Sequence, residues 1–160
     1  MKSRGFTLVE LIVTITIIGI LISFIIVYFP ETRAKARDSK RKSEVSQIGR
    51  FLTGSCYLPD GGEGEYDLKV IADELVANNP QFSRFLSQVP KDPKTGTDSD
   101  SMYFYLVDDN GSNCAIYANL ENTSEPVNLS ITEPTPGGGK GVFRGDFGWN
   151  GTNIYYHYSN

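Results

Sequence analysis

The chain has 160 residues, of which 39% are hydrophobic and 21% are charged, and its formal net charge is −4. This composition supports one domain, or one domain with an appendage, and excludes wholesale disorder. Two cysteines and one histidine exclude a dense disulfide scaffold, a four-thiolate zinc site and any site that needs two imidazoles.

Charge is divided unevenly along the chain. Residues 1–50 hold nine basic and four acidic side chains, whereas residues 51–160 hold six basic and fifteen acidic ones. The two parts therefore face different surroundings. The acidic part disfavours nonspecific contact with phosphates, so we predict no direct nucleic-acid binding.

The first predicted element is an apolar helix over residues 6–29, which contain one charged side chain, Glu10. A helix of 24 residues extends about 36 Å, and the hydrocarbon core of a bilayer is about 30 Å thick. The segment is therefore predicted to span a membrane. A carboxylate there costs about 2.5–3.5 kcal/mol, so Glu10 either reaches the headgroups or pairs with a cation of another chain. No lysine or arginine lies between Phe6 and Phe29 to pair with it.

A short cationic leader that ends in Gly5 precedes this helix, and residues 4–13 read RGFTLVELIV. This run resembles the N-terminus of the type IV pilin and pseudopilin family. The resemblance implies cleavage between Gly5 and Phe6, N-methylation of Phe6, and a Glu10 carboxylate that neutralises the N-terminal amine of a neighbouring subunit during assembly. Such a pair compensates two charges that are each costly in a low dielectric.

The resemblance also implies partners and a location. The partners are further copies of the chain and other pilins in a helical filament, a prepilin peptidase, a membrane platform protein and a cytoplasmic assembly ATPase. The precursor is expected to cross the inner (cytoplasmic) membrane once, with its head outside the cytoplasm, and to end in a cell-surface filament. The positive-inside rule alone favours the opposite orientation, because six basic residues lie between Arg33 and Lys42 and two lie in the leader.

Three other interpretations of the N-terminus stay open. A pseudopilin of a type II secretion system has the same N-terminal leader and apolar helix. So do the subunits of filaments for adhesion, motility, DNA uptake or secretion. An uncleaved, membrane-anchored extracellular binding domain belongs to another class. A secretory signal cut after Ala34-Lys35-Ala36 is the third, although its apolar region is longer than such signals have.

The predicted organisation is a leader at residues 1–5, a transmembrane and filament-core helix at 6–29, an amphipathic helix at 30–53, and a globular head at 54–160. Pro30, which lacks an N–H, and Gly19 are predicted to kink or end the first helical stretch. Arg33, Arg37 and Arg41 follow one helix face. This basic stripe is expected either to be solvated or to meet acidic surfaces of neighbouring subunits.

The fold class is predicted to be α+β, with the long kinked helix packed on a small antiparallel sheet, as in type IV pilins. Apolar spacing in the head predicts helices at residues 67–77 and 80–88. Alternation and turn residues predict strands at 102–107, 114–120 and 153–158, with a turn at 108–111. The glycine run at 137–141 is interpreted as a flexible connector.

The head offers few residues for chemistry. No catalytic set is visible, so we predict neither an enzyme nor a cofactor, and we expect His157 at a strand surface. Cys56 and Cys114 are expected either to form a disulfide, which export permits, or to remain two buried thiols.

Two further groups of side chains have alternative readings. Oxygen ligands make Asp98, Asp100, Asp108 and Asp109 weak candidates for calcium, although solvated acidic turns explain them as well. The strand tyrosines and Trp149 are expected to pack across strands rather than to form an adhesive or sugar-binding patch.

Overall fold

The computed structural model describes residues 6–83 and 89–160. The chain divides between Ala34 and Lys35 into two compact units. The helix α1 (Leu8–Leu52) belongs to both, so each unit is described by itself. Predictions for residues 1–5 and 84–88, including the leader and most of the second short helix, lie outside the described residues.

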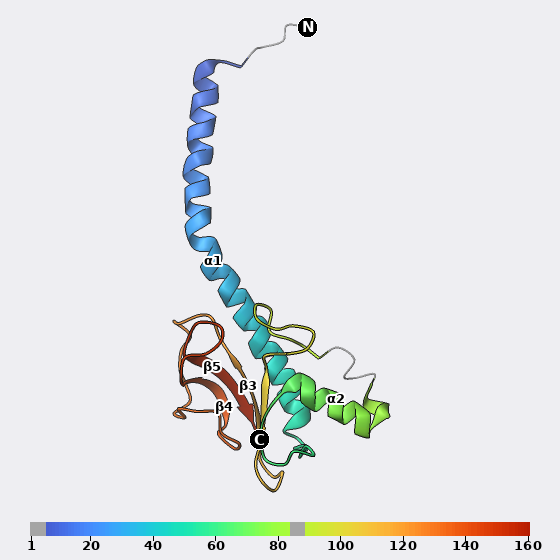
Figure 1. The fold of residues 1–160 in the computed structure, drawn as a ribbon. Coiled ribbons are helices and arrows are strands. Elements are labelled where there is room, and N and C mark those ends of the chain that lie inside the picture. Colours follow the sequence, from blue (N-terminus) through green and yellow to red (C-terminus); the bar gives the residue numbers. More distant parts are fainter. Residues whose placement is uncertain (1–5, 84–88) are drawn as a thin grey trace. The chain divides into compact units, whose positions relative to one another are not determined.

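The first unit contains the beginning of α1 (Figure 1), a helix long and apolar enough to cross a membrane. The large apolar side chains from Leu8 to Ile26 are 48–73% exposed in the isolated chain. Of the two alternatives predicted at Pro30, an end of the helix is excluded, because α1 continues through Gly19 and Pro30. A proline removes one hydrogen bond, which a long helix tolerates because its other bonds persist. Kinks at these two positions stay predictions.

The second unit contains a five-stranded sheet in which every neighbouring pair is antiparallel, in the order β1-β2-β3-β5-β4. Figure 1 shows β3, β5 and β4 side by side. The strands are β1 (Gly64–Asp67), β2 (Phe104–Val107), β3 (Cys114–Asn119), β4 (Lys140–Arg144) and β5 (Ile154–Ser159). The predicted α+β fold class, a long helix on a small antiparallel sheet, is confirmed.

The main core lies between one face of the sheet and two helices, the end of α1 and α2 (Leu68–Asn78). Val45 and Leu52 of α1 and Ile71 of α2 pack here against alternate residues of the strands. Gly49 lets α1 approach β5 closely, because a Cβ there would lie 2.5 Å from the Tyr158 ring. A smaller aromatic cluster covers the opposite face of the sheet.

Several predictions for the head need correction. The glycine run does not end in a flexible connector, since Lys140 and Gly141 begin β4. Backbone pairing with β5 stabilises β4 although its sequence is poor in strand-forming residues. The strand β1 was not predicted, and the structure has a 3₁₀ turn at Pro80–Phe82 where a longer helix was expected to begin.

Candidate functional site

Glu10 lies in the first turn of α1, where it caps the helix. Its Oε2 accepts hydrogen bonds from the backbone N–H of Thr7 at 2.8 Å and from the Thr7 hydroxyl at 2.8 Å. The Glu10 N–H in turn donates to Thr7 Oγ1 at 3.3 Å. This reciprocal pattern is a capping box, which satisfies N–H groups that an isolated helix end leaves unpaired. Thr7 therefore partners Glu10 within the isolated chain, a role that the sequence analysis missed although the spacing T-x-x-E signals it.

None of the described residues buries the helix around Glu10. Phe6 is 79% exposed, and the window of α1 with the highest mean hydropathy has no buried residue. Exposing such a surface to water costs a free energy of about 25 cal/mol per Å² of apolar area. The segment is therefore suited to lipid or to the apolar helices of other subunits.

The basic stripe of the amphipathic half is used differently from the prediction. The Arg41 side chain is fully buried and donates to three carboxylates, with 2.7–2.8 Å to Asp92, 2.7 Å to Asp38 and 2.7 Å to Glu121. The Arg37 guanidinium donates two hydrogen bonds of 2.7 Å to the Glu121 carboxylate. We call Arg37, Asp38, Arg41, Asp92 and Glu121 the buried ion cluster. It fastens α1 to two loops of the same head, so both arginines pair within their own head, Arg41 fully buried and Arg37 partly exposed.

The carboxylates of the buried ion cluster are satisfied by backbone groups as well as by arginine. Asp38 accepts the N–H groups of Glu121 and Asn122 at 2.8–3.1 Å. Asp92 accepts the N–H groups of Lys94 and Thr95 and the side-chain amide of Asn150. Buried charges are tolerated when they are paired and hydrogen-bonded in this way.

The pKa values of the cluster follow from these contacts. Burial opposes ionisation of Asp92, but the Arg41 guanidinium and the backbone N–H groups lower its pKa to about 2. Burial likewise opposes ionisation of Glu121, and Arg37 and Arg41 lower its pKa to about 2. The pKa of Arg41 is raised despite its burial, because Asp92 and Glu121 accept hydrogen bonds from its guanidinium. All three groups are therefore charged at neutral pH.

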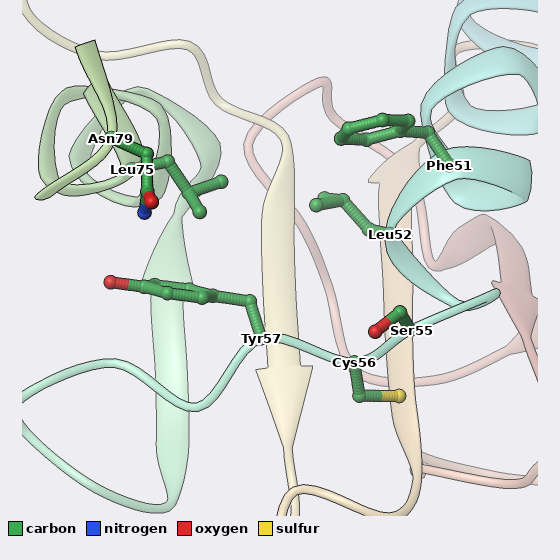
Figure 2. Close-up of a pocket in the computed structure, with 7 residues that line it drawn as sticks. All are labelled: Phe51, Leu52, Ser55, Cys56, Tyr57, Leu75 and Asn79. Atoms are coloured by element: carbon green, nitrogen blue, oxygen red, sulfur yellow. The ribbon is translucent and has the colours of Figure 1, made fainter. Parts of the chain in front are cut away.

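Cys56 and Cys114 are joined by a disulfide that links the chain after α1 to the start of β3, with 5.7 Å between their Cα atoms. Beside it lies a cavity of about 290 Å³, lined by Phe51, Leu52, Ser55, Cys56, Tyr57, Leu75 and Asn79. Figure 2 shows Phe51 and Leu52 on one side of this cavity and Tyr57 and Leu75 on the other. The side chains that line it are apolar or uncharged, and the Tyr57 hydroxyl among them donates to Glu74 at 2.6 Å.

The calcium candidates do not converge. Asp98 pairs with Lys91 at 2.5 Å, Asp100 accepts the Ser99 hydroxyl, and Asp108 accepts the Asn113 N–H. Within residues 6–83 and 89–160, no three histidine, cysteine, aspartate or glutamate side chains are grouped to hold a metal ion.

His157 is buried, which corrects the prediction that it lies at a strand surface. Its Nδ1 lies 2.7 Å from the Gly139 carbonyl oxygen, and its Nε2 accepts the Thr135 N–H at 3.4 Å. Nδ1 must carry the proton that is donated to the carbonyl, and burial lowers the pKa of the imidazole. His157 is therefore a neutral ring that holds the loop before β4 onto β5.

A second cavity, of about 110 Å³, lies over the outer face of the sheet and was not foreseen. Its walls include four aromatic and two acidic side chains, namely Tyr117, Phe143, Trp149, Tyr155, Glu133 and Asp146. We call this cavity the aromatic pocket. Gly148 is required beside it, because a Cβ there would lie 2.5 Å from the Tyr155 hydroxyl and from Asn119. The aromatic residues were predicted to pack across strands, and several do so, including Phe143 on Tyr155.

Comparison with known proteins identifies the N-terminal motif. Residues 1–26 match the family described as prokaryotic N-terminal methylation motif, which is the class III signal peptide of type IV pilins. No curated protein and no solved structure matches the chain. The motif and the fold together support a type IV pilin- or pseudopilin-like precursor, and the motif implies processing by a prepilin peptidase and assembly with other pilin-like subunits.

Proposed function

We propose that this chain is a structural subunit of a type IV pilus-like filament, assembled through its N-terminal helix after cleavage between Gly5 and Phe6. The match of residues 1–26 to the methylation motif carries this proposal. The exposed apolar surface of α1 up to Ile26 supports it, because that surface needs lipid before assembly and other helices afterwards. The proposed role is assembly rather than catalysis.

Cleavage changes the surroundings of Glu10. In the described chain its carboxylate is held by Thr7, the residue that follows the proposed new N-terminus at Phe6. An amine on Phe6, methylated after cleavage, supplies the cation that the apolar segment lacks. We propose that Glu10 pairs with this amine on a neighbouring subunit, because two buried charges compensate each other only when they meet. The capping contact then holds the carboxylate in place until the neighbour arrives.

The proposed precursor is anchored in the inner membrane with its head outside the cytoplasm, and the mature subunit lies in a surface filament with its acidic head outward. Assembly requires a membrane platform protein and a cytoplasmic ATPase. A disulfide in the head supports an exported location. A short, secretion-linked pseudopilus is distinguished from a pilus by the absence of filaments of micrometre length in electron micrographs.

The capping box provides a matched pair of variants to test the role of Glu10. Glutamine also serves at this position of a capping box, so Glu10→Gln keeps the cap and removes the charge. Thr7→Ala removes the capping hydroxyl and keeps the carboxylate. We expect Glu10→Gln to lower the amount of assembled filament more than about tenfold at unchanged membrane level, because an unpaired buried amine costs well over 1.4 kcal/mol. Thr7→Ala should still assemble.

The readouts are sheared filament, membrane-fraction protein and intact mass of the N-terminal fragment. A chain that begins at Phe6 and is one methyl group heavier supports processing. Normal assembly of Glu10→Gln contradicts the charge-pairing role of Glu10. A chain that keeps Met1 in a host with an active peptidase contradicts the filament proposal and favours an uncleaved, membrane-anchored binding domain. A chain that begins after Ala36 indicates a secreted protein instead.

A further inference from the structure

The aromatic pocket is built on rigid elements and is separate from every group used for assembly. Tyr117 comes from β3, Phe143 from β4 and Tyr155 from β5. Trp149 comes from the loop between β4 and β5. That loop is anchored by Asn150, whose N–H donates to Asn119 at 2.6 Å. The pocket walls are therefore held in place before any ligand arrives.

The rings of the pocket surround a small space rather than filling it. Phe143 stacks on Tyr155 with ring centroids 5.2 Å apart. Trp149 stands edge-on to Tyr155 at 5.8 Å and tilted to Tyr117 at 6.3 Å. A cavity of about 110 Å³ remains between them and the neighbouring loop. An engineered cavity of about 150 Å³ holds one benzene, so this pocket accommodates a group of four or five heavy atoms rather than a whole sugar ring.

The charge of the pocket is negative and uncompensated. Glu133 and Asp146 line it, and no lysine, arginine or histidine does. Neither carboxylate forms an ion pair or accepts a side-chain hydrogen bond within the part of the chain that the structure describes. Burial raises the pKa of Tyr155, and the charges of Asp146 and Glu65 raise it further, so the negative field reaches the rings.

Two further observations distinguish this pocket from ordinary aromatic packing. The indole Nε1–H of Trp149 is buried and has no hydrogen-bond partner among the described residues, which is rare for a buried donor. Phe147, between Asp146 and Trp149 in the sequence, is 79% exposed. An exposed ring in the loop that carries Trp149 is a feature of a surface that contacts another molecule.

We propose that the aromatic pocket binds an organic cation, a guanidinium or a methylated ammonium group. The electron-rich faces of tryptophan and tyrosine attract such cations, at about 0.5–2 kcal/mol for each contact. The two carboxylates add charge complementarity. These groups have four or five heavy atoms and give up their hydration more readily than an unmethylated ammonium. The same chemistry is offered by an arginine or methyl-lysine side chain of a protein and by a free choline-like molecule. This inference does not depend on the proposed filament role.

The single tryptophan of the chain lies in the pocket and provides a direct probe. The full chain in a sugar-free polyoxyethylene detergent is titrated with tetramethylammonium, choline and N-acetyl-arginine amide while Trp149 emission is recorded. The neutral isostere of choline, 3,3-dimethylbutan-1-ol, and ammonium chloride serve as controls. We expect saturable changes with the organic cations, at least tenfold weaker responses to both controls, and one preferred cation. Preference for the arginine amide indicates a guanidinium from a protein side chain, and preference for choline or tetramethylammonium indicates a methylated ammonium group, from a small molecule or from methyl-lysine.

Two isosteric variants test the carboxylates. The double variant Glu133→Gln with Asp146→Asn should weaken cation binding at least tenfold. Asp109→Asn, a change of an exposed acid in the turn between β2 and β3, should leave it unchanged. Unaltered emission of the unliganded variants verifies that the pocket is folded. Equal binding of the neutral isostere overturns the proposal, as does a saturable response to monosaccharides but not to cations. A folded protein without any saturable response also overturns it.

Discussion

The two halves of α1 differ in how their charged side chains are placed. Between Leu8 and Phe29 the helix holds one carboxylate, Glu10, among exposed apolar side chains, and Thr7 is its hydrogen-bond partner among the described residues. Beyond Lys35 the same helix holds Arg41, which is fully buried and contacts three carboxylates. Among the described residues the first half offers Glu10 no cation, whereas the second half contains the carboxylates that pair with Arg41 within the head. One continuous helix therefore combines a segment whose apolar side chains are exposed in the single chain with a segment that packs into its own head.

The largest effect on the head is expected from Arg41→Met. Methionine fills part of the space but leaves Asp38, Asp92 and Glu121 buried without their shared cation. Breaking a buried ion cluster in this way costs about 3–5 kcal/mol of unfolding free energy. Denaturant unfolding of the full chain in detergent measures it.

An exposed ion pair provides the control for Arg41. Lys69 and Asp73 pair at the surface of α2, so Asp73→Asn should change the free energy of unfolding by less than about 0.5 kcal/mol. A similarly small loss for Arg41→Met would remove the contrast between the two halves of α1.

The disulfide is expected to have the next largest effect. It closes a separation of 58 residues between the end of α1 and β3. Replacing both cysteines with alanine should lower the free energy of unfolding by about 2–4 kcal/mol, because the unfolded chain gains freedom. Non-reducing and reducing denaturant titrations of the wild type provide the same comparison without substitution. Coincident curves would contradict a stabilising bridge.

A smaller effect is expected from acid. The folded pKa values of Asp92 and Glu121, about 2, lie below those of the unfolded chain. Their stabilisation is therefore complete above about pH 4.5 and is lost as pH falls towards 2. His157 adds a loss that begins below its unfolded pKa of about 6.5, since the folded state resists protonation.

The unfolding midpoint measured from pH 7 to pH 2 checks this acid dependence. Arg41→Met should flatten the part of the curve below pH 4.5, because Arg41 is a main cause of both lowered carboxyl pKa values. The part between pH 6.5 and 4.5 should persist in this variant, since His157 does not contact Arg41. A curve that keeps its full acid slope in Arg41→Met would show that other groups control the pH dependence.

Local patterns predicted those elements of the head whose own residues favour one structure. Alternating apolar residues predicted β2, β3 and β5, and helical spacing predicted α2. The short β1 and the glycine-containing β4 were missed, because their backbones are held by pairing with β2 and β5 rather than by their own propensity. His157 was misplaced for a related reason, since the loop that covers it lies outside the strand pattern.

The sequence by itself identified the N-terminal motif and the apolar helix that follows it. Its cleavage motif, apolar length and single carboxylate are all consecutive residues, so no tertiary contact is needed to recognise them. Only the tertiary structure decided what the basic stripe does, because Arg41 contacts residues 51 and 80 positions away. The aromatic pocket was likewise decided by folding, since three strands and two loops bring its walls together. Contacts between distant residues depend on strand order and loop paths, and local residue patterns specify neither.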